Sequence, residues 1–497
     1  MSGLSRDDGR SVISRETFFV GGQWRKPDGN AKVDVVSPFT EELIGQVPQS
    51  VPADMDAAVS AARAAFDDGP WPRMSLHERS RYITQMGQLL GERIEEAVAL
   101  QIDEMGGPLR FVGPATRGAI SGIPSVVELA FEVRQREFRK GNPGPVVVMR
   151  DPVGVVAGII PWNGPVGSAL GKILPAVLAG CSIVLKPAPE TPLSAFLLAE
   201  AADDVGLPPG VLNIVPGGRE VGEYLVSHAG VDRVNFTGSS VAGSKVASLC
   251  GEQLKSVTLE LGGKSAAIVL DDADLDTQLD TLIDSSMPNN GQVCFATTRI
   301  LVSNRRSAEL VDRLVTAVGA LKVGDPHLAD TAFGPLVSSR QRDRVESYIR
   351  SGRDEGAHCA LGGGRPADME IGWFVEPTIF TDVDNSMRIA REEIFGPVVT
   401  VINYEDESDA ISIANDSEYG LGGAIFTSDI QHGLEVAAQI RTGTCRVNEA
   451  PPGGGGGPFG GVKRSGLGRE RGREGHESFY NLKSISLPRD FEESLDD

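Results

Sequence analysis

The chain has 497 residues and a net charge of −21, because 68 acidic residues outnumber 47 basic ones. Apolar residues make up 40% and charged residues 23%, a composition that excludes a disordered chain. The acidic charge argues against nucleic acid or an anionic membrane as a partner, since both attract clustered Lys and Arg. The 60 glycines indicate either many tight turns or a place where side chains have been removed.

The number and spacing of the cysteines and histidines indicate the cellular compartment and whether a metal site is expected. Five cysteines are scattered along the chain without a C-x-x-C pair, which excludes a disulfide scaffold and fits a reducing compartment. The polar N-terminus lacks the apolar region of a signal peptide, and no run approaches the roughly 18 apolar residues of a membrane span. We therefore expect a cytoplasmic protein without a membrane partner. The six histidines show no metal-binding spacing, so we expect no metal.

In chain order, the first fifteen or so residues are expected to form a flexible arm. Apolar residues between 54 and 133 recur at three- and four-residue spacing, which predicts helices. From 152 to 263, β-rich runs alternate with helix-like segments, which predicts βαβ units and a parallel sheet. A second alternating series begins at Ala266, and we interpret the glycine pair 262–263 before it as a hinge. The predicted strands are VGVVAGII, SIVLKP, VLNIV, RVNF and SVTLEL, then AAIVL, TRILV, FVEPTIF, PVVTVINY, GAIFT and TCRVN.

Two turns in the first series have the glycines and serines that bind phosphate. One is Gly217-Gly218 after VLNIV, and the other is Gly238-Ser239 after RVNFT. Backbone N–H groups at a helix start can hold a phosphate, although an ordinary capped helix fits each turn alone. Two adjacent turns of this kind favour a dinucleotide. The segment GGKS at 262–265 is not an ATP-binding loop, because Thr258 stands where that motif needs glycine.

Cys294 follows the small polar run Asn289-Asn290-Gly291. It lies between helical and β-like patterns and could start a helix, where a thiolate is favoured. A buried structural cysteine is the alternative, and the spacing does not separate the two.

Six motifs together resemble the aldehyde dehydrogenase superfamily. In order they are IPWN with Asn163, FTGS, LELGGK with Glu260, GQVC with Cys294, EEIFGP and PFGG. The resemblance runs from about residue 19 to 487. It implies an α/β fold with a Rossmann-like cofactor domain, a second α/β catalytic domain and a small β oligomerisation extension.

The resemblance also implies a division of the chain. We assign residues 1–133 and 152–262 to the NAD(P)-binding domain, 263–465 to the catalytic domain, and 134–151 and 476–497 to oligomerisation segments. A homodimer or homotetramer is expected, in which the β-like C-terminal tail adds a strand to a neighbouring subunit. The other partner is a small-molecule aldehyde.

The implied chemistry is oxidation of an aldehyde to a carboxylic acid. Cys294 would attack the carbonyl and form a thiohemiacetal, and the Asn163 amide with the Cys294 N–H would stabilise the alkoxide. Loss of a hydride leaves a thioester, for which Glu260 would activate water. Relatives that transfer the acyl group to coenzyme A lack this glutamate, so water is the expected acceptor. Lys172 and Glu470 are implied as a proton route, and an ordinary surface ion pair is the alternative.

For the cofactor, the resemblance implies NAD, with NADP possible. Lys186 would bind the adenosine ribose, and Glu393 the nicotinamide ribose. NAD-preferring members often have glutamate where Pro189 stands here, and Glu190 comes one position later. The implied cofactor contacts are Ile159, Trp162, Lys186, Gly218, Thr237, Gly238, Ser239, Leu261, Glu393 and Phe395.

The substrate pocket is expected to be wide. In a helix after Asn163, one face would carry only small residues, at i, i+3, i+4 and i+7, where relatives often have aromatic ones. Close helix packing is the alternative. A second wall reads PPGGGGG before PFGG, again without bulky residues. We therefore expect a bulky apolar aldehyde, such as an aryl, polycyclic or terpenoid compound. The predicted pocket residues are Gly164, Gly167, Ser168, Gly171, Val293, Phe295, Gly453 and Phe459.

Three other functions stay open. Arg446 near the second wall leaves room for a smaller carboxylated semialdehyde as substrate. A non-catalytic protein of the same fold is disfavoured by the presence of Cys294, Glu260 and Asn163. A thioesterase or esterase would use the same cysteine without a cofactor, and dependence of the rate on added NAD⁺ separates it.

Overall fold

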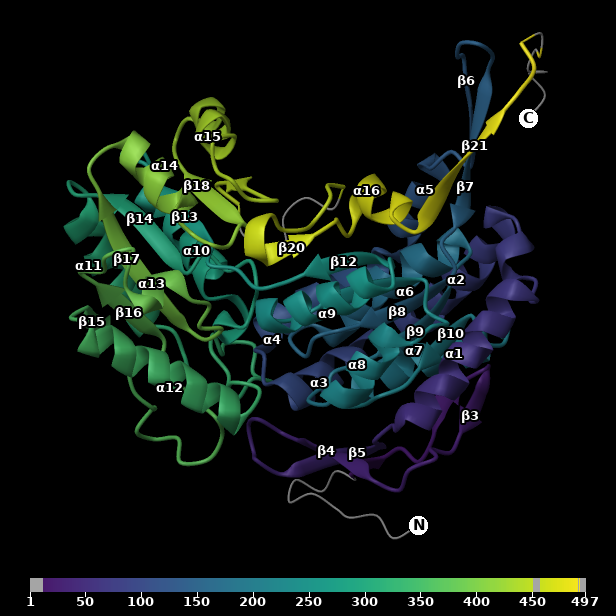
Figure 1. The fold of residues 1–497 in the computed structure, drawn as a ribbon. Helices are drawn as coiled ribbons and strands as arrows, with labels where there is room; N and C mark the ends of the chain where they lie inside the picture. The colour runs from purple at the N-terminus through teal and green to yellow at the C-terminus, as the bar shows by residue number, and fades with distance from the viewer. Residues whose placement is uncertain (1–11, 450–455, 490, 492–497) are drawn as a thin grey trace.

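The computed structural model describes residues 12–449, 456–489 and 491. Two large sheets lie side by side, each with helices on both faces, and two three-stranded sheets lie outside them (Figure 1). Within these residues, no helix combines the length and the apolar character that crossing a membrane requires.

The first large sheet has five parallel strands at its centre and antiparallel strands at its edges. In spatial order its strands are β20 (Gly466–Leu467), β12 (Ser256–Glu260), β11 (Arg233–Thr237), β8 (Val155–Ile159), β9 (Ser182–Lys186), β10 (Leu212–Ile214), β2 (Phe18–Val20) and β3 (Gln23–Arg25). Its helices are α1 (Pro52–Asp67), α2 (Leu76–Glu92), α3 (Ile94–Met105), α4 (Leu109–Ser121), α5 (Ile123–Glu132), α6 (Pro165–Ala179), α7 (Leu193–Asp204), α8 (Arg219–Ser227) and α9 (Ser240–Glu252).

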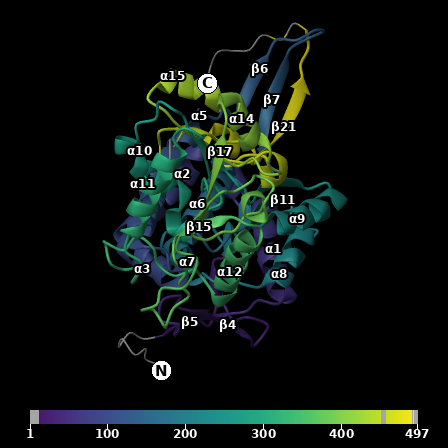
Figure 2. The ribbon, with the colours of Figure 1, turned by 90° about the vertical axis from the view of Figure 1, so that its left-hand side faces the viewer.

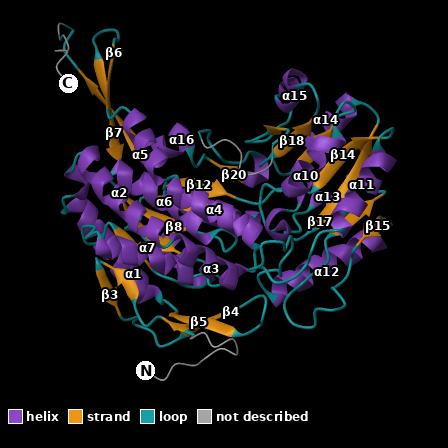
Figure 3. Cartoon of the chain, turned by 180° about the vertical axis from the view of Figure 1, so that it is seen from behind, coloured by secondary structure: helices purple, strands orange, loops and turns teal. Residues whose placement is uncertain are grey.

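Alternate residues of β8 pack on opposite faces of this sheet. Val155 and Ala157 join the core under α1, α8 and α9, whereas Val156 joins the core under α2, α5, α6 and α7. Every residue of β8 is therefore buried, which explains why the sequence VVAGI has no polar side chain. Figure 3 shows the helices α2, α4 and α6 lying over this sheet.

The second large sheet is parallel except for its edge strand β15. In spatial order its strands are β15 (His358–Leu361), β16 (Thr378–Thr381), β17 (Val398–Tyr404), β14 (Arg299–Ser303), β13 (Ala266–Val269), β18 (Gly423–Phe426) and β19 (Arg446–Val447). One face packs on α10 (Leu275–Ser286) and α11 (Ser307–Gly319). The other packs on α12 (Ser339–Asp354), α13 (Arg388–Arg391), α14 (Glu407–Asn415) and α15 (Ile430–Ala437).

The two small sheets lie at opposite ends of the molecule. One contains β1 (Ile13–Ser14), β5 (Leu43–Pro48) and β4 (Lys32–Val36). The other contains β21 (Tyr480–Ser486), β7 (Val146–Pro152) and β6 (Arg136–Arg139). Strand β21 follows the short helix α16 (Gly472–Glu477) in the chain. Figures 1 and 2 show β6, β7 and β21 extending away from the body of the molecule.

The predicted helices and both alternating series are confirmed. The run FVEPTIF forms a strand only from Thr378, because Pro377 lacks the N–H that a ladder needs. Strand β15 was not predicted, since its sequence HCAL has no alternating pattern. The C-terminal tail forms the predicted strand, but it pairs with β7 of the same chain; its addition to a neighbouring subunit stays a prediction.

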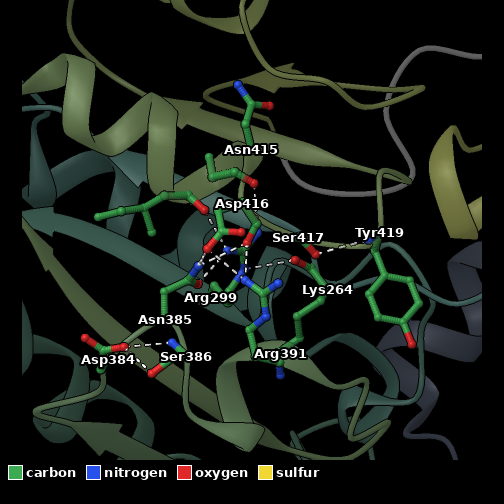
Figure 4. Close-up of polar contacts among 12 residues, drawn as sticks. Lys264, Arg299, Asp384, Asn385, Ser386, Arg391, Asn415, Asp416, Ser417 and Tyr419 are labelled. Atoms are coloured by element: carbon green, nitrogen blue, oxygen red, sulfur yellow. Dashed lines mark hydrogen bonds and ion pairs between the residues drawn. The ribbon is translucent and has the colours of Figure 1, made fainter.

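A buried arginine at the start of β14 connects α14 and the loop before α13 to the chain that enters β13. Arg299 is 1% exposed, and its guanidinium donates hydrogen bonds to the carbonyls of Lys264, Ile413 and Ala414 and to the Asn385 side chain, at 2.8–3.0 Å. Figure 4 shows Arg299 at the centre of this polar cluster. The arginine therefore fixes the chain that leads from the first sheet into β13.

We expect Arg299→Met to lower the free energy of unfolding by about 3 kcal/mol or more, because buried acceptors lose charged donors. The urea midpoint measures this loss. Arg305→Met is the matched control: the Arg305 side chain is 81% exposed and pairs with Asp271, so its change should stay within about 0.5 kcal/mol. Equal midpoints for the two variants would contradict the assignment.

Candidate active site

Three of the residues predicted to bind the cofactor, and the predicted base Glu260, lie at the carboxyl ends of central strands of the first sheet. Ile159 ends β8, Lys186 ends β9, Thr237 ends β11 and Glu260 ends β12. Strand β8 lies between β9 and β11, so the order of strands reverses beside it. Parallel α/β sheets bind ligands at such reversals, outside the carboxyl ends of the strands.

Lys186 is 5% exposed. Its ammonium donates to the carbonyls of Pro187 at 2.9 Å and Gly217 at 2.8 Å, and burial lowers the pKa of Lys186 to about 8. The contact with Gly217 ties the end of β9 to the turn after β10. Nearby, Glu190 forms an ion pair with Arg340 at 2.9 Å.

Both predicted phosphate turns lead into helices. Ser239 caps α9 by accepting a hydrogen bond from the Ala242 N–H, and Gly218 precedes α8 with open space where a Cβ would lie. At Gly238 a Cβ would lie 2.6 Å from the Phe236 ring, so this turn requires glycine. Both helix starts can therefore bind an anion.

Sequence reasoning missed Val241 in the first turn of α9, which is 77% exposed. An exposed apolar side chain next to a phosphate-binding turn could contact a flat ring. The signal was an apolar residue two positions after the capping serine Ser239, in the first turn of the helix.

Glu393 and Phe395 come from the second sheet's side of the molecule. The Glu393 carboxylate accepts a hydrogen bond from the Gly263 N–H at 2.9 Å, and burial raises its pKa to about 7. A side chain at Gly262 would collide with this carboxylate. The Phe395 ring packs edge-on against Trp162 at 5.2 Å. The predicted contacts Trp162, Glu393 and Phe395 thus lie where the two sheets meet, as does buried Leu261.

Cys294 does not start a helix, so that interpretation is wrong. It lies in a turn between the short helical turn Pro288–Gly291 and β14. Asn289, Asn290 and Gly291 all have positive φ, which ends the helical path, and a Cβ on Gly291 would collide with the Gly396 carbonyl. The thiol therefore has no helix N-terminus to favour its ionised form.

The surroundings of Cys294 instead favour the neutral thiol. Burial and the neighbouring carboxylates of Glu393 and Glu260 raise the pKa of the thiol to about 12. Nucleophilic use of this cysteine consequently requires a base.

Asn163 joins the loop after β8 to the Cys294 segment. Its side-chain N–H donates to the Gln292 carbonyl at 2.8 Å, two residues before Cys294. The Asn163 backbone carbonyl accepts a hydrogen bond from the Asn289 side-chain amide at 3.3 Å. The Asn163 amide is therefore fixed beside the cysteine turn.

Glu260 is 3% exposed, and both carboxylate oxygens are buried without a hydrogen-bond partner among the described residues. The structure thus excludes an exposed strand glutamate. Burial, then the charge of nearby Glu470, raises the pKa of Glu260 to about 9, while Lys172 opposes this shift. An unpaired buried carboxyl is costly, which is typical of a functional site.

Lys172 and Glu470 form an ion pair, and the Lys172 side chain is fully buried. The pair is therefore not an ordinary surface contact. The Lys172 ammonium also donates to Asn235 and Thr237 on β11, both at 2.8 Å. A chain of polar groups consequently leads from Glu470, whose charge acts on Glu260, through Lys172 to β11.

The small-residue face predicted after Asn163 lies on α6. A Cβ on Gly171 would meet nothing within 4 Å, and Cβ atoms on Gly164 and Gly167 would meet only Ser168 at 4.0 Å and Ala119 at 3.8 Å. The alternative, that these glycines allow a neighbouring helix to pack closely against α6, is therefore not supported. Within the described part of the structure, this face borders open space.

Most of the predicted second wall, residues 451–455, lies outside the described residues, whereas the two aromatic residues predicted to line the pocket are described. Phe295, next to Cys294, packs edge-on against Phe459 at 5.9 Å. Val293 is buried, and Gly453 lies outside the described residues. Within the described part of the chain, no three His, Cys, Asp or Glu side chains gather in a way that could hold a metal ion.

Comparison with known proteins matches this architecture to one family. The sequence fits the "Aldehyde dehydrogenase family" over residues 24–485. It is 46% identical over 481 residues to geranial dehydrogenase of Castellaniella defragrans, covering 96% of this chain and 99% of that protein. It is 42% identical over 470 residues to 3-succinoylsemialdehyde-pyridine dehydrogenase of a Pseudomonas species, covering 94% and 98%.

A solved structure agrees. The crystal structure of Mycobacterium tuberculosis aldehyde dehydrogenase complexed with NAD⁺ matches with a TM-score of 0.95 and 47% sequence identity, covering 97% of this chain and 100% of that one. The shared fold extends over both large sheets and the site between them. The chain belongs to the aldehyde dehydrogenase family.

Proposed function

We propose that this protein oxidises a bulky aldehyde to the carboxylic acid with NAD⁺, using Cys294 as nucleophile and water as acyl acceptor. The observation that carries the proposal is the buried, unpartnered carboxyl of Glu260 near the Cys294 thiol, whose pKa it raises. The thiol needs a base to become a nucleophile, and a nearby carboxylate with a raised pKa is a better proton acceptor than an ordinary one.

In the first step, Glu260 in its ionised form takes the thiol proton. The Cys294 sulfur then forms a bond to the aldehyde carbon, and the carbonyl oxygen becomes an alkoxide. Asn163 keeps one side-chain N–H beyond the one that it donates to Gln292, and with the Cys294 N–H it would stabilise that alkoxide. Because these donors are fixed by the fold, little reorganisation is needed.

The cofactor residues fit a dinucleotide. Two open helix starts suit the two phosphates, Lys186 supplies a buried amine, and Glu393 a carboxylate beside the glycine pair. A nicotinamide dinucleotide held there would supply the hydride acceptor that is needed to convert the thiohemiacetal on Cys294 into a thioester. NAD⁺ is also the cofactor in the matching Mycobacterium tuberculosis structure.

Glu260 would act again in hydrolysis. Its carboxylate takes a proton from water, the resulting hydroxide attacks the thioester carbon, and the Cys294 thiolate leaves. The proton can then pass toward Glu470 and Lys172, which lie close enough to shift the Glu260 pKa. The burial of this pair supports a role as a proton route.

A bulky substrate is supported by the open glycine face of α6. It is also supported by the relative named geranial dehydrogenase, whose substrate name denotes a terpenoid aldehyde. The relative named for a semialdehyde supports the second candidate, a carboxylated substrate. The three-stranded sheet of β6, β7 and β21 would join subunits into a dimer or tetramer, and the cytoplasm is the proposed compartment.

Catalysis should depend on Cys294 and Glu260 in different ways. We expect Cys294→Ala to abolish NAD⁺-dependent aldehyde oxidation, whereas Cys359→Ala, at another partly exposed cysteine, keeps it. Wild-type kcat should rise with pH until about pH 9, because only ionised Glu260 acts as base. Glu260→Gln should lower kcat by about 10²–10⁴-fold and remove this pH dependence.

The control for the glutamate is Glu128→Gln, an exposed position on α5. Its rate and pH profile should match those of the wild type. Aldehyde-dependent formation of NADH that persists in Cys294→Ala would contradict the proposed function, and an unchanged pH profile in Glu260→Gln would contradict the role of the base.

A large side chain on the glycine face of α6 should restrict the enzyme to smaller aldehydes. We expect Gly171→Phe to lower kcat/KM for terpenoid and polycyclic aldehydes by about ten-fold or more, with little change for acetaldehyde, because the new ring occupies pocket volume. Gly91→Phe is the control, since a Cβ on Gly91 of α2 likewise meets nothing within 4 Å. Equal losses for large and small aldehydes would contradict a wide pocket.

Cofactor choice should depend on Glu190. Its charge acts on Lys186, so a 2′-phosphate near Lys186 would meet a carboxylate. We expect kcat/KM to favour NAD⁺ over NADP⁺ by about ten-fold or more, and Glu190→Gln to narrow the ratio while Glu128→Gln does not. A wild-type preference for NADP⁺ would overturn the cofactor assignment.

A further inference from the structure

Two arginines and two phenylalanines form a continuous stack beside Cys294. The Arg446 guanidinium lies over the Phe295 ring at 5.6 Å, and the Arg471 guanidinium lies over the Phe459 ring at 5.1 Å. The two rings meet edge-on at 5.9 Å. Because Phe295 directly follows Cys294, two positive charges flank the aromatic wall of the proposed substrate pocket.

Arg446 lacks the partners that buried arginines need. Its Nε and Nη2 atoms are fully buried without a hydrogen-bond partner among the described residues. The charge of Glu449 acts on the guanidinium, but Glu449 is exposed and forms no ion pair with it within the described ranges. A buried guanidinium N–H without an acceptor is unfavourable, and contact with one ring face does not satisfy it.

The contrast with Arg299 shows what a structural arginine looks like in this protein. Arg299 is also buried, and its guanidinium has four acceptors at 2.8–3.0 Å. It therefore stabilises the fold without any ligand. Arg446 lies at β19 on the edge of the same sheet, but two of its donor atoms have no acceptor among the described residues.

We propose that Arg446 determines substrate specificity by binding a carboxylate or other oxygen acceptor at the far end of the aldehyde. The inference rests on the proposed function and narrows it: the substrate is bulky in its middle and carries an acceptor away from the reacting carbon. A guanidinium forms paired hydrogen bonds with a carboxylate. The same charge, together with Arg471, repels aldehydes that carry an ammonium group.

The test compares aldehydes that differ only at the far end. Semialdehydes of increasing length, from succinic semialdehyde upward, are each paired with the n-alkanal of equal carbon number, and 4-trimethylammoniobutanal supplies a cationic substrate. At the best length, wild-type kcat/KM should favour the semialdehyde over its alkanal by about ten- to a hundred-fold, mainly through KM. The cationic aldehyde should be the poorest substrate.

Arg446→Met keeps the length of the side chain and removes the donors. It should abolish the preference for semialdehydes while alkanal oxidation stays within about three-fold, and it should relieve the exclusion of the cationic aldehyde. Arg446→Lys keeps the charge and should retain part of the preference. Arg305→Met, at an exposed arginine, should change nothing.

Calorimetric binding of the dicarboxylate that matches the best semialdehyde gives a readout without turnover. Its affinity should fall in Arg446→Met by about the same factor as kcat/KM. If alkanals are oxidised but the wild type shows no preference for semialdehydes, or if Arg446→Met loses all substrates equally, this inference is wrong. If no aldehyde is oxidised, the proposed function itself is wrong.

Discussion

The close approach of the two large sheets at Gly262 and Gly263 is the constraint on which the site depends. The chain leaves β12 at Glu260 and enters β13 at Ala266, and these glycines lie between. A Cβ on Gly262 would collide with the Glu393 carboxylate, and one on Gly263 would lie 2.5 Å from the Cys294 carbonyl. A side chain at Gly263 would displace the Cys294 backbone, and one at Gly262 would displace the Glu393 carboxylate. The glycine pair therefore permits contact between the sheets, and its interpretation as a hinge stays a prediction.

This contact also sets the electrostatics of the site. Burial is the first cause of the raised pKa values of Cys294, Glu260 and Glu393, and each carboxylate opposes ionisation of the thiol. The cysteine is therefore a protonated thiol at neutral pH, protected from unwanted oxidation or alkylation. In the proposed mechanism, reactivity depends on moving one proton within this small group of residues. Buried Lys172, together with Arg469 and Arg471, supplies the positive charge that favours an ionised Glu260.

The sequence predicted the parts of the fold that depend on local pattern. Buried strands such as β8 are apolar throughout, and turns such as that at Gly238 need glycine, so both are visible in short segments. The motif around Cys294 identified the residue but not its conformation, because the left-handed path of Asn289 and Asn290 is imposed by contacts with distant segments. Whether the glycines of α6 face a neighbour or open space likewise depends on tertiary structure. Arg446 and Phe295 are separated by about 150 residues, so their stacking has no sequence signal.

Of the two unusual features of the composition, part of the glycine surplus bears on the substrate pocket, whereas the acidic net charge does not. Glycines occur both where backbones approach closely, as at Gly262, and where a side chain would enter open space, as at Gly171. Only the second kind widens a pocket, so counting glycines could not separate them. The net charge of −21 describes the surface, whereas the wall beside Cys294 carries Arg446 and Arg471. A local positive field in an acidic protein selects negatively charged ligands at short range, because solvent ions screen distant charges more than charges close to the ligand.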